Sequence, residues 1–235
     1  MKKSIKKVSF DFLSLALLVA LDLSLKWTTK DLVWSFWLSS ICVGYLTIVS
    51  SVLKLPLFVH AKKEEHNFQD KLPKHINLIL GGFSLFLIGF FSIHFLGFHL
   101  GHSIFLKSAF PLEGFTSKSS GLVDFGYLKD ILFYLMPQYW CFVLVSLFNK
   151  RDIFNKDIEN FDLRSISIGP YQNVIKIHLL IFVIVGLRAL EIQDLVIHSV
   201  VLIVFVTDFS GVMGKKIKKA RRLKKKRRQR DKSAA

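Results

Sequence analysis

The sequence is poor in cysteine and in acidic residues, and both shortages exclude classes of site. Its two cysteines, Cys42 and Cys141, lie inside apolar runs. Their spacing matches neither a zinc finger nor a disulfide framework, so we interpret them as small buried hydrophobic residues. Asp and Glu together number 17 against 33 Lys and Arg. Only Asp22 and Asp208 lie well inside apolar runs, which is too few carboxylates for a di-iron site.

Several catalytic signatures are also absent. The sequence contains no H-E-x-x-H and no E-x-x-H, which bind zinc in metalloproteases and di-iron centres in helix bundles. It contains no G-x-S-x-G nucleophile motif either. No small-x-small cleavage site follows the basic N-terminus, so we expect an uncleaved first span rather than a signal peptide. These absences disfavour a membrane hydrolase and leave the question of enzymatic activity open.

Long apolar runs are abundant. Hydrophobic residues make up 51% of the chain and the mean hydropathy is +0.42, although the net charge is +16. This combination is typical of a membrane protein, whose apolar spans and basic loops alternate along the chain. Runs of about 20 residues are long enough to cross the hydrocarbon core as helices. Six such runs are present, at 8–25, 32–53, 76–106, 128–148, 171–190 and 192–213.

The distribution of Lys and Arg predicts the orientation of these spans. Basic residues are frequent before the first span, between the second and third, between the fourth and fifth, and after the sixth. The other three connections carry few. Because basic loops stay in the cytoplasm, we expect both termini there. The predicted fold is an all-α bundle of six transmembrane helices over residues 1–214, followed by a cytoplasmic polybasic tail over 215–235.

The tail begins KKIKKARRLKKK and continues with further basic residues. One interpretation is topological, because the charge alone keeps the last helix end inside. Another is binding to anionic lipid headgroups, each basic residue contributing about 1 kcal/mol near the surface. No aromatic residue is interleaved for base stacking, which disfavours nucleic acid as a partner. The candidate lipid-binding residues are Lys215, Lys216, Lys218, Lys219, Arg221 and Arg222.

Three histidines stand out in the third apolar run, FFSIHFLGFHLGHSIF. On a helix, His94 and His102 differ by about 80° in azimuth and His99 lies about 60° beyond His102, so all three share one broad face. Gly97 and Gly101 form a G-x-x-x-G on that side, which predicts close packing of another helix. As one helix the run would be about 46 Å long. It therefore either projects from the membrane or breaks near Gly97.

Ionisable groups inside a bilayer are costly and usually have a function. His94 and His102, with His99 as a weaker third, are candidate ligands for a metal ion or a haem iron. The same histidines alternatively relay protons, line a substrate cavity, or only bond a neighbouring helix. His99, His102 and His198 are expected towards the outer face. His178 and Asp208 are expected in the cytoplasmic half, so His178, Asp208 and His198 are assigned to a second site or to a supporting role.

The spans resemble an uncharacterised family of bacterial multi-pass membrane proteins, classed only as a domain of unknown function. The resemblance covers spans two to six and is most specific in the third. The matching positions are Trp34, Trp37, Gly44 and Tyr45 in the second span; Phe90, Phe91, His94, Gly97, Phe98, Gly101 and His102 in the third; Pro170, Tyr171, Val174 and His178 in the fifth; and Asp208 in the last. The resemblance implies a multi-pass fold in the bacterial inner membrane, with His94, His102 and His178 as the residues to test.

This chain departs from the family pattern at two places. Ser39 and Ser40 stand where the family usually has Glu-Asn, and Gln138, Tyr139 and Trp140 stand where its fourth-span motif opens with His. Both departures remove polar groups that a metal site would use. The first function hypothesis is a membrane protein that binds a metal or haem. The alternatives are a non-catalytic accessory or assembly subunit that docks a larger membrane complex, or a small transporter.

Overall fold

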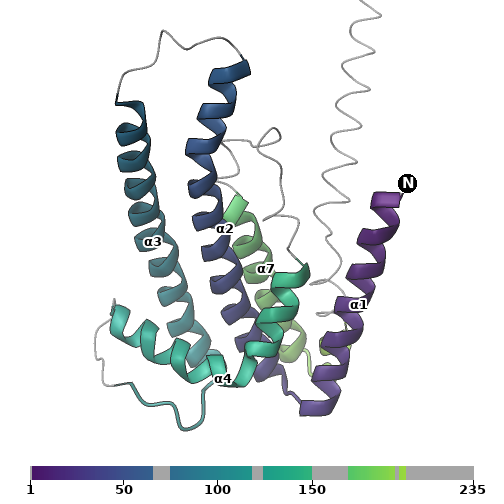
Figure 1. The fold of residues 1–235 in the computed structure, drawn as a ribbon. Coiled ribbons are helices and arrows are strands. Elements are labelled where there is room, and N and C mark those ends of the chain that lie inside the picture. Colours follow the sequence, from purple (N-terminus) through teal and green to yellow (C-terminus); the bar gives the residue numbers. More distant parts are fainter. Residues whose placement is uncertain (1, 66–74, 118–123, 150–168, 194–195, 200–235) are drawn as a thin grey trace, which may run out of the picture.

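A computed structural model describes residues 2–65, 75–117, 124–149, 169–193 and 196–199. Every regular element in these ranges is helical (Figure 1). Their bounds are α1 Lys2–Leu25, α2 Thr29–Glu65, α3 Ile76–Ala109, α4 Phe125–Asn149 and α7 Gly169–Ala189, and residues 196–199 are also helical. The all-α prediction therefore holds for the described part of the chain.

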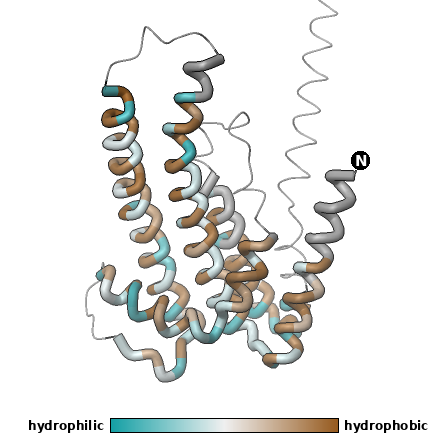
Figure 2. The backbone as a smooth tube through the Cα atoms, viewed as in Figure 1, coloured by the Kyte–Doolittle hydropathy of each residue, from teal (hydrophilic) through white to brown (hydrophobic). Residues whose placement is uncertain are grey.

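Three of the helices are long and apolar enough to cross a membrane. They cover Thr29–His60, Ile76–Ala109 and Phe125–Phe148. Shorter apolar helical stretches lie at Ala16–Leu25 and His178–Ala189. Figure 2 shows that hydrophobic residues predominate along the whole of α3. These features are those of a helical membrane protein, whereas the last predicted span lies almost entirely outside the described residues.

α2 is the central helix. It packs against α3, α4 and α7, while α1 packs mainly on α4 (Figure 1). The stretch of α2 from Leu32 to Ile41 is buried on all sides, as expected for a helix that is apolar around its circumference. Trp34 and Trp37 each donate an indole N–H to a backbone carbonyl, that of Phe110 at 2.9 Å and that of His99 at 3.3 Å. These bonds satisfy both buried donors and fix α2 against α3.

A capping box starts α2. The Thr28 backbone N–H donates to Asp31 Oδ2 at 2.8 Å, and the Asp31 N–H donates to the Thr28 hydroxyl at 3.4 Å. This reciprocal pair satisfies two donors at the helix start. Asp31 Oδ1 accepts a further hydrogen bond from the Tyr139 hydroxyl at 2.7 Å, so the same carboxylate also joins α2 to α4.

Two helices carry an internal proline. Pro56 lies in α2, which continues to Glu65, and Pro137 lies in α4. Proline removes one backbone hydrogen bond and bends a helix, and Figure 1 shows α4 bent along its length. α3 has no break: it runs through Gly97 as one helix of 34 residues. Of the two possibilities for the third span, the continuous helix is the one observed.

Candidate functional site

Aromatic and imidazole rings fill the contact between α3 and α7. Tyr171, in the first turn of α7, lies against Phe91 and Phe95 of α3 with ring centroids 6.4 and 6.3 Å apart. Further along, Phe105 and Phe182 meet at 6.2 Å. Large rings therefore separate the two backbones and leave a layer in which the histidines lie.

His102 and His178 form the closest ring pair in this layer. Their centroids are 3.7 Å apart and their planes are inclined by 31°. Phe98 covers His178 at 4.8 Å, and Phe105 stacks on His102 at 6.2 Å. Both rings are thus held between α3 and α7 by neighbouring aromatic side chains.

Three nitrogen atoms of this pair are buried without a hydrogen-bond partner among the described residues. They are Nδ1 and Nε2 of His102 and Nε2 of His178. His178 Nδ1 lies 2.6 Å from the Val174 carbonyl. Because a carbonyl only accepts, Nδ1 carries the proton, and Nε2 of His178 presents a lone pair. The pair therefore combines close imidazoles with lone pairs that no described residue satisfies.

His99 lies beside the pair but is itself satisfied. It is fully buried, its ring centroid is 6.3 Å from that of His178, and its Nδ1 donates to the Phe95 carbonyl at 2.9 Å. Its Nε2 lies 3.3 Å from the Ser40 hydroxyl of α2, which donates to it. Ser40 therefore joins α2 to the histidine layer.

His94 lies outside the pair. Its ring stacks on Phe90 at 6.1 Å and meets Tyr171 edge-on at 5.7 Å, and the side chain is exposed. The structure therefore brings His102 together with His178 rather than with His94. The expected separation of His178 from His102 by depth is wrong, because both rings occupy one layer of the α3–α7 contact.

His198 belongs to a different group, which is more deeply buried than His102 and His178. Its Nδ1 lies 3.1 Å from Asp22 Oδ2 of α1, and its Nε2 lies 3.4 Å from the Thr29 hydroxyl at the start of α2. The side chains of His198 and Asp22 are only 7% and 9% exposed. This group links α1, α2 and the helical residues 196–199. Asp208 and the tail residues Lys215, Lys216, Lys218, Lys219, Arg221 and Arg222 lie outside the described residues.

The glycines of the third span do not contact another described helix. A methyl group added at Gly97 or Gly101 would have no described atom within 4 Å, leaving aside α3's own backbone nearby. The expected close helix packing at this G-x-x-x-G is therefore not formed within the described part of the chain. Gly44 of α2 makes the close approach instead, because the Phe95 ring lies directly over it.

Sequence reasoning missed two of these groupings. It identified His102 and His178 but placed them in separate halves of the membrane, and it did not pair Asp22 with His198. A usable signal existed for the pair of Asp22 and His198, since both residues lie near span ends predicted on the same side of the membrane.

Within the described ranges no three His, Cys, Asp or Glu side chains are arranged to hold a metal ion. The histidine pair thus offers at most two nitrogen ligands from well-placed side chains.

Comparison with known proteins supports the resemblance at the level of the family. A family model described as "Family of unknown function (DUF6498)" matches residues 5–234. No curated protein matches the chain, and no solved structure does. The match extends over nearly the whole sequence, and the chain belongs to this family of unknown function.

Proposed function

We propose that the protein is an integral membrane protein of six spans, with both termini in the cytoplasm, that binds a transition-metal ion through His102 and His178. The bacterial inner membrane is the proposed location. One observation carries the proposal: the two adjacent rings contain three buried nitrogen atoms that form no hydrogen bond with any described residue. A buried polar atom without a partner costs about 1–3 kcal/mol, which a ligand would offset.

The donor set favours a borderline metal. Neutral imidazole suits zinc, copper, iron and nickel, whereas magnesium and calcium prefer oxygen. The bond from His178 Nδ1 to the Val174 carbonyl leaves Nε2 as the ligating atom and orients the ring. Two protein ligands leave coordination positions for water, for a further side chain or for a bound molecule.

Coordination requires the two rings to rotate apart. Imidazoles that share a tetrahedral ion, with metal–nitrogen bonds of about 2.0–2.1 Å, have centroids about 5 Å apart. The centroids are now 3.7 Å apart, so metal binding would open the stack by rotating the imidazoles. A haem held by both histidines fits less well, because its axial rings lie on opposite faces of the macrocycle, about 6 Å apart. The metal ion is therefore preferred over haem.

Metal content tests this proposal. The full chain is purified in mild detergent without chelators and without a polyhistidine tag, and its metals are measured by mass spectrometry. We expect about one ion per chain, reduced about tenfold or more in His102→Ala and in His178→Ala because each removes a ligand. His75→Ala is the matched control, since His75 is exposed and precedes α3. Unchanged metal in both ligand variants, or no metal after supplementing the growth medium, contradicts the proposal.

A second candidate is an accessory subunit that docks another membrane protein. The open surface at Gly97 and Gly101 supports it, because small residues let a second transmembrane helix approach closely. Nearby on α3, Ile93 and Phe90 are largely exposed. Gly101→Leu should abolish co-purification of a partner at native expression without lowering the protein's own melting temperature. Absence of any stable partner in the unaltered protein counts against this candidate.

A further inference from the structure

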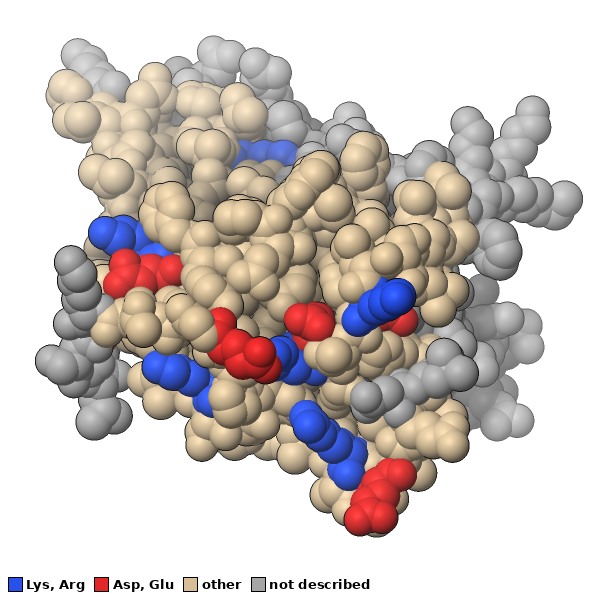
Figure 3. Space-filling view, turned by 90° about the horizontal axis from the view of Figure 1, so that it is seen from below, with Lys and Arg blue, Asp and Glu red and all other residues tan. Residues whose placement is uncertain are grey.

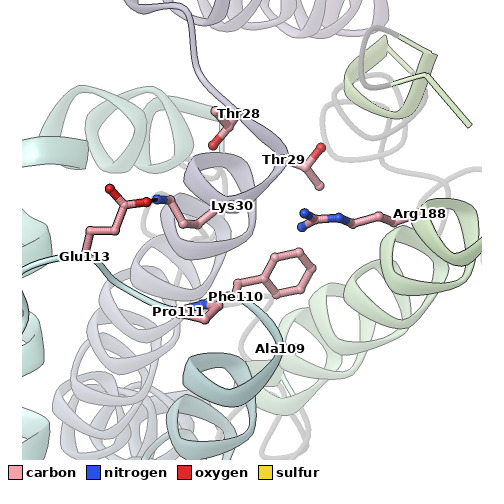
Figure 4. Close-up of a pocket in the computed structure, with 8 residues that line it drawn as sticks. All are labelled: Thr28, Thr29, Lys30, Ala109, Phe110, Pro111, Glu113 and Arg188. Carbon is pink, nitrogen blue, oxygen red and sulfur yellow. Dashed lines mark hydrogen bonds and ion pairs between the residues drawn. The ribbon is translucent and has the colours of Figure 1, made fainter. Parts of the chain in front are cut away.

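A cavity lies at the end of the molecule where α1 turns into α2, about two helical turns beyond His102 along α3. Its volume is about 400 Å³, within the range of small-molecule sites. Figure 4 shows side chains from three parts of the chain facing into it: the start of α2, the segment that follows α3, and the end of α7. The lining residues are Thr28, Thr29, Lys30, Ala109, Phe110, Pro111, Glu113 and Arg188.

Arg188 is the cation that this cavity leaves unneutralised. Its guanidinium points into the cavity (Figure 4) and lies over the Phe110 ring, 5.5 Å from the centroid. Within the described ranges it has no ion pair, whereas Lys30 across the cavity pairs with Glu113 at 2.9 Å. Figure 3, which views this end, shows basic and acidic side chains close together on an otherwise uncharged surface. The cavity lining thus has two cations and one carboxylate.

The carboxylate of Asp31, the neighbour of Lys30 in the sequence, is already engaged. Asp31 Oδ2 accepts from Thr28, and Asp31 Oδ1 accepts from the Tyr139 hydroxyl. Asp31 therefore serves the capping box and does not line the cavity. The positive end of the α2 dipole also faces this cavity, because α2 begins at Thr29. The carbonyl ends of α3 and α7 also lie at the lining, because α3 ends at Ala109 and α7 ends at Ala189. The excess of cations over carboxylates in the lining, rather than the helix dipoles, therefore favours an anion beside Arg188.

We propose that this cavity binds a phosphate group, with Arg188 as its principal ligand and Lys30 as a second cation. The planar guanidinium presents paired N–H donors that match phosphate oxygens. Its central carbon lies 5.5 Å from the centroid of the Phe110 ring, a cation–π contact that favours this position of the side chain. Lys30 is partly exposed and its partner Glu113 is 90% exposed, so Glu113 can turn to solvent when phosphate enters.

The phosphate has two possible sources, a phospholipid headgroup or the free ion. A headgroup would place its acyl chains along apolar side chains near the cavity, and α3 and α7 offer exposed Phe105 and Phe182 there. Free phosphate needs only the polar lining. In both cases Arg188 would bind the phosphate oxygens, and one experiment distinguishes the two sources.

The full chain, purified in a maltoside detergent without phosphate, is melted by tryptophan fluorescence during three titrations. The titrants are phosphatidylglycerol in mixed micelles, diacylglycerol with the same acyl chains, and inorganic phosphate. We expect a saturable rise in melting temperature with phosphatidylglycerol or inorganic phosphate, and none with diacylglycerol. Arg188→Gln should weaken apparent affinity about tenfold or more. Lys129→Gln, an exposed cation of α4 outside the cavity lining, is the matched control.

Each outcome decides one point. Saturation with phosphatidylglycerol alone assigns the site to lipid headgroups, and equal saturation with inorganic phosphate assigns it to the free ion. Equal affinities in the unaltered protein and Arg188→Gln, or an equal response to diacylglycerol, overturn the proposal. Should Arg188→Gln not fold, Arg188→Lys replaces it: it keeps the charge but loses the paired donors, and an unchanged affinity there also overturns Arg188 as principal ligand.

Discussion

Replacing His198 by Leu is expected to lower the free energy of unfolding by about 1–3 kcal/mol, the usual cost of leaving a buried polar group without its hydrogen-bond partner. His198 Nδ1 lies 3.1 Å from Asp22 Oδ2, and both side chains are almost fully buried. Asp22 Oδ1 already lacks a hydrogen-bond partner among the described residues. Without His198 the carboxylate would stay buried with neither oxygen bonded to a described residue, so the protein should melt well below the unaltered chain.

A double-variant cycle separates this effect from lost packing. Asp22→Leu together with His198→Leu removes both polar groups, and an apolar pair of similar volume is often as stable as the pair it replaces. We therefore expect the double variant to recover most of the melting temperature lost by His198→Leu alone. If the two single losses simply add in the double variant, the pair does not stabilise the contact between α1 and residues 196–199.

Gly44→Ala should destabilise the protein by about 1–3 kcal/mol, because it overfills a packed site. A methyl group there would overlap the Phe95 ring, which is completely buried and also contacts Tyr171 and His99. The ring cannot move without shifting the layer in which the histidines lie. We expect a lower melting temperature, and a change in the amount of metal bound by His102 and His178.

Gly101→Ala provides the matched control. Both glycines lie in helices, so both substitutions gain the same helix propensity of about 1 kcal/mol. Gly101 has open space around it, so its variant should be as stable as the unaltered protein or slightly more stable. The difference between the two variants therefore reports the contact with Phe95. Equal melting temperatures would show that the close approach of α2 and α3 is softer than the structure indicates.

Hydrophobic patterning predicted the helices well where their ends coincide with the ends of apolar runs. The predicted spans 76–106, 128–148 and 171–190 correspond to α3, α4 and α7 within three residues at each end. It failed at the end of the second span, where the apolar run stops at Leu53 and α2 continues to Glu65. Lys and Glu are good helix formers, so a helix continues beyond the part that lipid requires to be apolar.

The depth of a residue in the membrane was harder to predict than its helical conformation. Counting residues from the cytoplasmic ends separated His102 from His178, because α3 is much longer than α7. Counted instead from Ala109 and Ala189, which close these helices near one cavity, the two residues differ by only about one helical turn. The imidazole side chains are long enough to bridge this displacement along the helix axes. Which helix ends meet is a tertiary property, and the periodicity of one span carries no information about it.

The metal site at His102 and His178 is tested most directly by X-ray absorption spectroscopy of the metal-loaded full chain in detergent. The account predicts two imidazole nitrogen ligands at about 2.0–2.1 Å if the ion is zinc, and loss of imidazole scattering in His102→Ala with His178→Ala. A spectrum without imidazole ligands, or one unchanged in the double variant, would contradict the account and leave the stacked pair as a packing contact between α3 and α7.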